Sequence, residues 1–155
     1  MPVVDASVVV DLVAPDVGRD APARLLFARW AADGTELVAP GLLWLETANA
    51  LLTGIRQGRW SGAAADAAAA LLERIPLRRA DTSRDQSRAI ELARRYDNWP
   101  AYDMIYVALA ERLGTQMITA DERLCARLAH LGWVTGVDQA CRDGGPMPGA
   151  APALV

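Results

Sequence analysis

The sequence contains no lysine, and all 16 of its cationic side chains are arginine. A P-loop needs a lysine beside the phosphates, so P-loop nucleotide hydrolysis is excluded, and lysine Schiff-base chemistry is excluded with it. There is one histidine, His130, and there are two cysteines, Cys125 and Cys141. The usual zinc ligand sets cannot be assembled from them, and they form no disulfide framework. We expect reduced cysteines and a cytoplasmic protein.

Long apolar runs are also missing. The longest weakly polar stretch, residues 63–72, is alanine-rich and is interrupted by Asp66, so we expect no membrane span. The N-terminus has no basic cluster, and Asp5 and Asp11 interrupt its apolar run, which argues against a secretory signal. Hydrophobic residues nevertheless make up 52% of the chain and charged residues 23%, which excludes a wholly disordered chain. The net charge of −3 is unlike that of proteins that hold nucleic acid by charge alone.

Short apolar segments alternate with helical patterns along most of the chain. Strands are predicted at residues 2–5, 36–39, 77–80, 116–119 and 133–135. Helices are predicted at residues 6–13, 16–32, 42–57, 61–75, 81–96, 102–113 and 121–131. This alternation predicts an α/β fold, a three-layer α/β/α sandwich with a mostly parallel central sheet. We expect one domain over residues 1–142, and a disordered tail over the Gly- and Pro-rich residues 143–155.

Carboxylates gather where such a sheet binds ligands, beyond the carboxyl ends of its strands. They are Asp5 after the first strand, Asp121 after the fourth, Asp103 at the start of an apolar helix, and Glu46 inside an earlier helix. Each aspartate has an alternative interpretation as a helix N-cap or turn residue, and Glu46 as a solvated helix residue. Capping explains neither a mid-helix glutamate in an apolar neighbourhood nor the gathering of several carboxylates at one edge.

A divalent cation would explain why carboxylates come together here. Neighbouring carboxylates repel one another, and burying them unpaired is costly. Oxygen ligands without histidine or cysteine select Mg²⁺ or Mn²⁺. These ions polarise phosphoryl oxygens and activate water, so the set indicates phosphoryl transfer or phosphodiester hydrolysis. A phosphoaspartate fold, as in haloacid-dehalogenase-like phosphatases, is a weaker alternative because it needs an aspartate where this chain has Ser7, and a lysine.

Four segments resemble the PIN-domain ribonucleases, and most closely the VapC-type toxins of bacterial toxin–antitoxin pairs. They are VVDAS at residues 3–7, LETANAL at 45–51, YDMIYVALA at 102–110 and ITADERL at 118–124. The segments follow the order and spacing of the family over roughly residues 2–138. The resemblance implies a parallel sheet between helices and acidic residues that bind Mg²⁺ or Mn²⁺. It also implies cleavage of single-stranded or looped RNA to 5′-phosphate and 3′-hydroxyl products.

The resemblance also implies roles for individual residues. Asp5 and Asp103 are expected to be the core metal ligands, with Asp121 completing the pocket directly or through water. Glu46 is expected to position the metal or the attacking water. The leading interpretation is therefore a Mg²⁺- or Mn²⁺-dependent endoribonuclease that acts as a toxin. The alternative is a catalytically inactive PIN-fold module that binds RNA or protein.

Neighbouring residues and partners follow from the same resemblance. Ser7 and Thr119 are expected to orient ligands or solvent with their hydroxyl groups. Asn49 either hydrogen-bonds Glu46 or the substrate, or packs in the core. The expected partners are an RNA substrate, a cognate VapB-type antitoxin whose C-terminal segment covers the groove, and a second copy in a homodimer. Trp60 and Trp99, flanked by loop residues, are candidates for one of these protein interfaces.

Overall fold

The computed structural model describes residues 1–97 and 99–143, so the predicted disordered tail lies outside the described residues except for Asp143. Within that part of the chain, five parallel strands form one sheet in the order β3-β2-β1-β4-β5. The strands are β1 (Val3–Val4), β2 (Leu37–Ala39), β3 (Leu77–Arg79), β4 (Met117–Thr119) and β5 (Val134–Gly136). All five overlap the predicted strands, and the sheet is parallel throughout.

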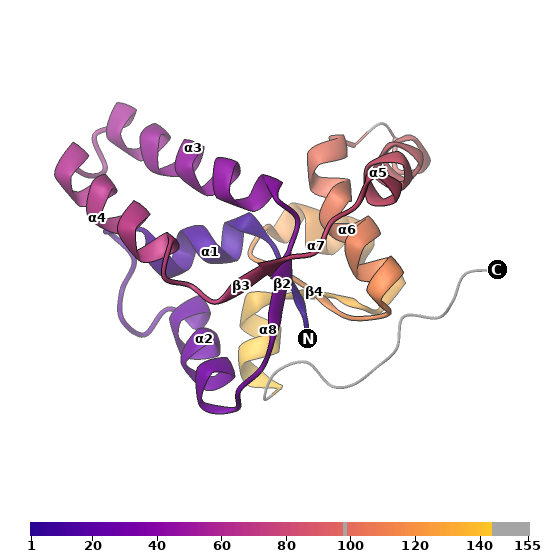
Figure 1. Ribbon diagram of the computed structural model, residues 1–155, viewed down its shortest axis with the longest axis horizontal. Coiled ribbons are helices and arrows are strands. Elements are labelled where there is room, and N and C mark those ends of the chain that lie inside the picture. Colours follow the sequence, from indigo (N-terminus) through magenta and orange to yellow (C-terminus); the bar gives the residue numbers. More distant parts are fainter. Residues whose placement is uncertain (98, 144–155) are drawn as a thin grey trace.

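Helices cover both faces of this sheet, which confirms the predicted α/β/α layers (Figure 1). One layer contains α1 (Ala6–Val13), α2 (Pro22–Ala32), α3 (Leu42–Arg56), α4 (Gly62–Leu72) and α8 (Val137–Arg142). The other contains α5 (Ser83–Arg95), α6 (Ala101–Leu113) and α7 (Glu122–Leu128), which continues into the 3₁₀ turn η1 (Ala129–Leu131). In the described residues, no helix is both long enough and apolar enough to cross a membrane.

Two helices differ from the prediction. We expected a helix from residue 16, but α2 begins at Pro22, because Gly18 and Pro22 interrupt the backbone and proline favours the first helical position. Helix α8 was not predicted at all. It has six residues and buries only Val137 and Ala140, which is too short a pattern to indicate a helix.

The order in which the chain adds strands to the sheet reverses between β1 and β4. The crevice that holds the candidate site forms at this position. The chain proceeds from β1 to β2 and β3 on one side, and from β4 to β5 on the other. Val3 pairs with Val38 in one direction and with Met117 in the other. Where connections diverge in this way, a crevice forms at the carboxyl ends of the strands. Asp5 directly follows β1, and Thr119 ends β4, so both lie at this crevice.

A continuous apolar core fixes these strand ends in place. Both residues of β1, Val3 and Val4, are completely buried, as are Met117 and Ile118 of β4. Every residue from 104 to 110 in α6 is buried as well, so this helix has no solvated face along its central part. Burying one such side chain stabilises the fold by about 1.5–3 kcal/mol. Asp5 and Asp103 therefore adjoin elements that are completely buried or nearly so.

Trp60 is buried in a second apolar cluster, formed mainly by α1, α3 and α4, so the expectation that it lies at an interface is wrong. Its indole N–H donates to the Leu51 carbonyl at 2.9 Å, and its ring lies directly over Gly54 of α3. A Cβ at position 54 would come within 1.9 Å of the ring. The absence of a side chain at Gly54 is what allows α3 to pack against this tryptophan.

Candidate active site

A cavity of about 220 Å³ lies at the crevice between β1 and β4, and all four predicted carboxylates line it: Asp5, Glu46, Asp103 and Asp121. Each comes from a different element. Asp5 lies between β1 and α1, Glu46 in the second turn of α3, Asp103 in the first turn of α6, and Asp121 at the N-cap of α7. Ser7 lines the same cavity. The structure therefore brings together residues that are up to 116 positions apart in the sequence.

Asp5 is the most deeply buried of the four carboxylates, with 8% of the residue exposed. Its Oδ2 accepts hydrogen bonds from the Ser7 hydroxyl and the Thr119 hydroxyl, both at 2.6 Å. Burial nevertheless raises the pKa of Asp5, and the charge of Asp121 acts in the same direction. Asp5 occupies the N-cap position of α1, but its side chain makes no capping hydrogen bond. The capping interpretation is therefore wrong for Asp5.

The Ser7 and Thr119 hydroxyls both contact the protein's own carboxylate, Asp5, and their predicted role in orienting ligands or solvent stays a prediction. Thr119 is completely buried, and its Oγ1 also accepts from the backbone N–H of Asp121 at 3.0 Å. The Ser7 hydroxyl accepts from the backbone N–H of Ala120 at 2.9 Å. Together these bonds join the loop after β4 to the carboxylate after β1, so they fix Asp5 and Asp121 relative to each other.

Asp103 is held by a tryptophan. The indole N–H of Trp99 donates to Asp103 Oδ2 at 2.7 Å. Burial, and to a lesser extent the charges of Asp5 and Asp121, raise the pKa of Asp103 to about 6 against the lowering effect of this hydrogen bond. The N-cap of α6 is Pro100, so Asp103 is not a helix cap and that alternative is wrong.

Glu46 is held by a tyrosine. The Tyr106 hydroxyl, on a residue only 1% exposed, donates a short hydrogen bond to Glu46 Oε2. Burial raises the pKa of Glu46 to about 7, and the charges of Asp5 and Asp103 contribute to the rise. Burial and the carboxylate also raise the pKa of Tyr106, which keeps its hydroxyl protonated as a donor. Glu46 is half-buried at the cavity wall, so its interpretation as a solvated helix residue is wrong.

Asp121 combines two roles. Its Oδ1 accepts from the backbone N–H groups of Arg123 and Leu124, at 2.8 and 3.0 Å, so it caps α7 as its alternative interpretation predicted. It lines the carboxylate cavity at the same time.

Asn49 lies outside the carboxylate cavity, on the exposed side of α3, so it does not pack in the core. No hydrogen bond joins Asn49 to Glu46 in the described residues. Asn49 instead lines a neighbouring recess together with Glu46.

The donors to each carboxylate converge on one of its two oxygens. These oxygens are Oδ2 of Asp5, Oε2 of Glu46, Oδ2 of Asp103 and Oδ1 of Asp121. All these donors are neutral groups, and none of the ion pairs among the described residues involves any of the four. The negative charge at the cavity is therefore not neutralised by a protein cation.

This donor set suits a hard divalent cation. It consists only of carboxylate oxygens, which Mg²⁺ and Mn²⁺ prefer over nitrogen or sulfur. As the side chains stand in the described part of the chain, no three acidic, histidine or cysteine residues are close enough to form a complete ligand group. The fit therefore rests on the chemistry of the donors and on their unneutralised charge.

Two of the supporting residues were missed in the sequence. Tyr106 follows Asp103 by three positions and so shares its face of α6, but its neighbours in that helix are apolar, which is the pattern of a core residue. Trp99 precedes Asp103 by four positions, and its predicted place at a protein interface stays a prediction. The sequence offers one signal for Tyr106 and Trp99. Each is an aromatic residue with a polar atom, and each lies three or four positions from a candidate carboxylate.

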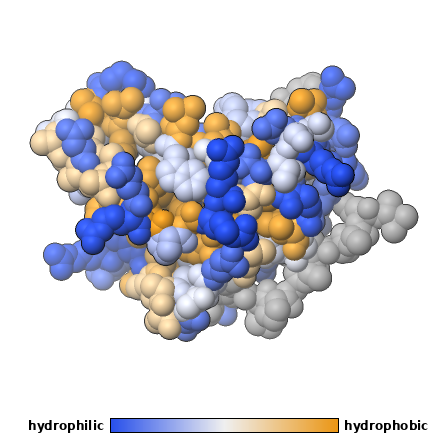
Figure 2. All heavy atoms as spheres, viewed as in Figure 1, coloured by the Kyte–Doolittle hydropathy of each residue, from blue (hydrophilic) through white to orange (hydrophobic). Residues whose placement is uncertain are grey.

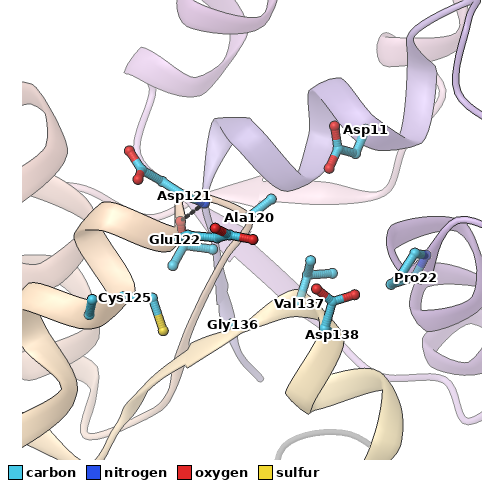
Figure 3. A pocket seen from close by; sticks show the side chains of 11 residues that line it. Asp11, Pro22, Ala120, Asp121, Glu122, Cys125, Gly136, Val137 and Asp138 are labelled. Atoms are coloured by element: carbon cyan, nitrogen blue, oxygen red, sulfur yellow. Dashed lines mark hydrogen bonds between the residues drawn. The ribbon is translucent and has the colours of Figure 1, made fainter.

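A second, larger cavity of about 460 Å³ lies on the other side of Asp121. Figure 3 shows Asp11 of α1, Glu122 of α7 and Asp138 of α8 around it, with Cys125 at its edge. Burial and the nearby charge of Asp138 raise the pKa of Asp11. The acidic character of the carboxylate cavity thus continues past Asp121 along the surface.

Comparison with known proteins agrees with this geometry. The PIN domain family matches residues 3–131, which include all four carboxylates. The chain is 36% identical over 122 residues to ribonuclease VapC3 from Mycobacterium tuberculosis strains CDC 1551 / Oshkosh and ATCC 25618 / H37Rv. The alignment covers 79% of this chain and 83% of that protein. The chain belongs to the PIN-domain family and is similar to its VapC-type ribonucleases.

Proposed function

We propose that this protein is a Mg²⁺- or Mn²⁺-dependent endoribonuclease that acts as the toxin of a toxin–antitoxin pair. The observation that carries the proposal is the cavity at the β1–β4 crevice, where four carboxylates meet without a neutralising cation. The similarity to ribonuclease VapC3 supports RNA as the substrate.

The four carboxylates have distinct roles in this proposal. Asp5 and Asp103 hold the divalent cation, and Asp121 completes its site directly or through water. Bound there, the cation supplies positive charge that stabilises the phosphodiester as it gains negative charge and lowers the pKa of a water. Glu46 orients the attacking water and accepts its proton. Burial and the neighbouring carboxylates raise the pKa of Glu46 in the metal-free protein, which makes it a stronger base than an exposed glutamate.

The neutral donors keep these carboxylates ready to act. The Ser7 and Thr119 hydroxyls fix Asp5 at Oδ2, and the Trp99 indole fixes Asp103 at Oδ2. Each donor restrains one oxygen without neutralising the charge of the group. Arginines in these positions would form ion pairs and reduce the attraction for a cation.

The expected partners fit the same surface. A VapB-type antitoxin would cover the carboxylate cavity with its C-terminal segment, and a cationic side chain of the antitoxin would complement the acidic lining of the cavity.

We also propose that residues 1–142 act as one domain, that the protein forms homodimers, and that it works in the cytoplasm. Both cysteines are free in the structure, as a reducing compartment requires.

Cleavage of total RNA by the purified, antitoxin-free protein tests the proposal. Discrete fragments with 5′-phosphate ends are expected with Mg²⁺ or Mn²⁺, and none with EDTA. Asp103→Ala is expected to abolish cleavage, whereas Asp66→Ala, which removes an exposed carboxylate on α4, is expected to cleave like the wild type. Absence of cleavage with either metal, in a protein that melts cooperatively, would refute the nuclease and favour the module that only binds RNA or protein.

A further inference from the structure

Large hydrophobic side chains are exposed directly beside two of the carboxylates. Tyr102, next to Asp103 in the first turn of α6, is 56% exposed, and Leu45, next to Glu46 in α3, is 61% exposed. Figure 2 shows hydrophobic atoms reaching the surface over the upper part of the molecule, where α3 and α4 lie in Figure 1. Both side chains lie at the edge of a polar site, where a molecule bound at that site would cover them.

These side chains line a recess that adjoins the carboxylate cavity. The recess has a volume of about 350 Å³ and is lined by Leu42, Leu45, Glu46, Asn49 and Tyr102. Glu46 lines both spaces, so the two are neighbours across this one side chain. A group bound in the recess would therefore lie beside the reacting phosphate. We call this recess the base pocket.

We propose that the base pocket binds one unstacked nucleobase of a single-stranded RNA, next to the phosphodiester that is cut. Tyr102 stacks on the base, Leu42 and Leu45 form the apolar wall, and the Asn49 amide hydrogen-bonds the base edge. Single-stranded RNA is read in this way, by stacking on aromatic side chains and by hydrogen bonds to exposed base edges. This inference rests on the proposed nuclease function and names the part of the substrate that the site recognises.

The lining of the pocket favours a base over other occupants. A phosphate is disfavoured, because the one charged residue of the lining, Glu46, is acidic. A leucine or phenylalanine of a protein partner would fill the apolar part but leave the Asn49 amide without a hydrogen-bond partner, which costs free energy when the amide is buried. A base has an apolar face and a polar edge, so it matches both parts of the lining.

The amide at position 49 gives the proposal a specificity test. An asparagine offers an NH2 donor group and a carbonyl acceptor, whereas an ionised aspartate offers only acceptors. Guanine presents two adjacent donors on its Watson–Crick edge, and an aspartate can accept both. Asn49→Asp is therefore expected to shift the base preference toward guanine, and Asn49→Ala is expected to weaken the preference without replacing it.

The experiment uses a pool of 12-nucleotide single-stranded RNAs of random sequence, cleaved in Mn²⁺, with the fragment ends sequenced. Tyr102→Ala is expected to raise KM by about 5- to 100-fold, the range for loss of one base–aromatic stack, and to flatten the base frequencies beside the cut. Tyr102→Phe keeps the stacking face and is expected to retain both the KM and the preference. Leu71→Ala, which truncates another exposed hydrophobic residue on α4, is expected to match the wild type.

A substrate with an abasic site at the preferred position separates stacking from a general loss of structure. The wild type is expected to lose at least the factor on this RNA that Tyr102→Ala loses on the intact RNA, because the abasic RNA also lacks the base edge that Asn49 binds. Tyr102→Ala, which has already lost the stack, is expected to lose less than the wild type does. Equal losses in both proteins would overturn the base pocket, as would an unchanged KM and cleavage pattern in Tyr102→Ala.

A measurement of RNA binding tests the base pocket independently of cleavage. If the wild type cuts no RNA, the proposed function fails. The affinity for a fluorescently labelled form of the same RNA pool, measured by fluorescence anisotropy, then tests the base pocket alone. Tyr102→Ala is expected to bind about 5- to 100-fold more weakly than the wild type, and equal affinities would overturn the pocket. If Tyr102→Ala has a lower mass in solution than the wild type but the same RNA affinity, Tyr102 contacts a second copy of the protein. That result would also overturn the base pocket.

Discussion

Raising the pH without divalent cations is expected to destabilise the protein between about pH 4 and pH 7. The pKa of Asp103 is raised from 3.8 to about 6, and that of Glu46 from 4.5 to about 7. A carboxyl with a raised pKa binds its proton more tightly in the folded state than in the unfolded state. The resulting stabilisation is fully present below the unfolded pKa and is lost as the pH rises through the folded pKa. Burial shifts Asp5 in the same direction.

One buried carboxyl acts in the opposite direction, but outside this pH window. Burial alone would raise the pKa of Asp85, but hydrogen bonds from Arg112 and Thr82 lower it below its usual 3.8. Its stabilisation is present above the unfolded pKa and is lost only as the pH falls through the folded value. Between pH 4 and pH 7 the slope is therefore determined by the carboxyls with raised pKa values, which are Asp5, Asp11, Glu46 and Asp103.

The expected loss of stability follows from the raised pKa values of Asp103 and Glu46, reduced for solvent screening. One pKa unit corresponds to about 1.4 kcal/mol. Because Asp103 and Glu46 are only half-buried, solvent screening reduces the contribution of each to about 1–1.5 kcal/mol. Together they correspond to a loss of about 2–3 kcal/mol, and to a fall in Tm of about 4–12 °C for a chain of this length.

Thermal melts followed by circular dichroism, in EDTA between pH 4.5 and pH 8, measure this effect. Adding Mn²⁺ at pH 7.5 is expected to restore the Tm, with about 2.7 kcal/mol of stabilisation when the ion is at 100 times its Kd. The double variant Asp103→Asn with Glu46→Gln is expected to have a shallower profile, in which only Asp5 and Asp11 still act in this direction. Asp66→Asn is expected to have the wild-type profile. A wild-type Tm that stays constant or rises from pH 5 to pH 7.5 in EDTA would refute the reasoning.

Three further substitutions test the contacts around the site and the core. Tyr106→Phe removes the donor that lowers the pKa of Glu46, so the pH–rate profile of RNA cleavage is expected to move to higher pH and its maximum to fall about 10-fold. Gly54→Ala places a Cβ 1.9 Å from the Trp60 ring and is expected to lower the free energy of unfolding, measured in urea, by about 1–3 kcal/mol. Asp85→Ala leaves Arg112 without its partner and is expected to lower the same quantity by about 3 kcal/mol.

Each of these has a control or an opposing outcome. Gly62→Ala adds a Cβ that meets nothing within 4 Å, so it is expected to leave the free energy of unfolding unchanged or to raise it. Equal effects at positions 54 and 62 would contradict the packing argument. An unshifted pH–rate profile in Tyr106→Phe would show that the tyrosine does not control Glu46. A loss below about 1 kcal/mol in Asp85→Ala would mean that water replaces the buried pair.

The sheet and the four carboxylates were predictable because each depends on a local pattern. Short apolar runs such as Val3–Val4 indicate buried parallel strands from the local sequence alone, without knowledge of what packs against them. A carboxylate after a strand indicates the ligand edge of the sheet. By contrast, α8 could not be predicted, because its stability comes from packing against α2 and the end of the sheet and not from its own pattern.

The donors around the carboxylates were not predictable, because their roles arise only from tertiary placement. A tyrosine at position 106 in an apolar helix has the pattern of a core residue, and it is indeed buried. Nothing local indicates that its hydroxyl meets Glu46, which lies 60 residues earlier on another helix. Likewise, the sequence places Trp99 in a break between helices, but the direction of its indole N–H depends on how α6 packs.

The distribution of arginine explains how the cavity keeps its charge. Arginines form every ion pair found in the described residues, yet none pairs with the cavity carboxylates. The guanidinium of Arg127 illustrates the separation, because it lies over the Trp99 ring, 5.0 Å from its centroid, and pairs with Asp97. The neutral indole thus contacts both this cation, through its face, and Asp103, through its N–H. A direct Arg127–Asp103 pair would hold the carboxylate equally well but would oppose the binding of a second cation, so an aromatic donor at this position preserves the affinity that the proposed function requires.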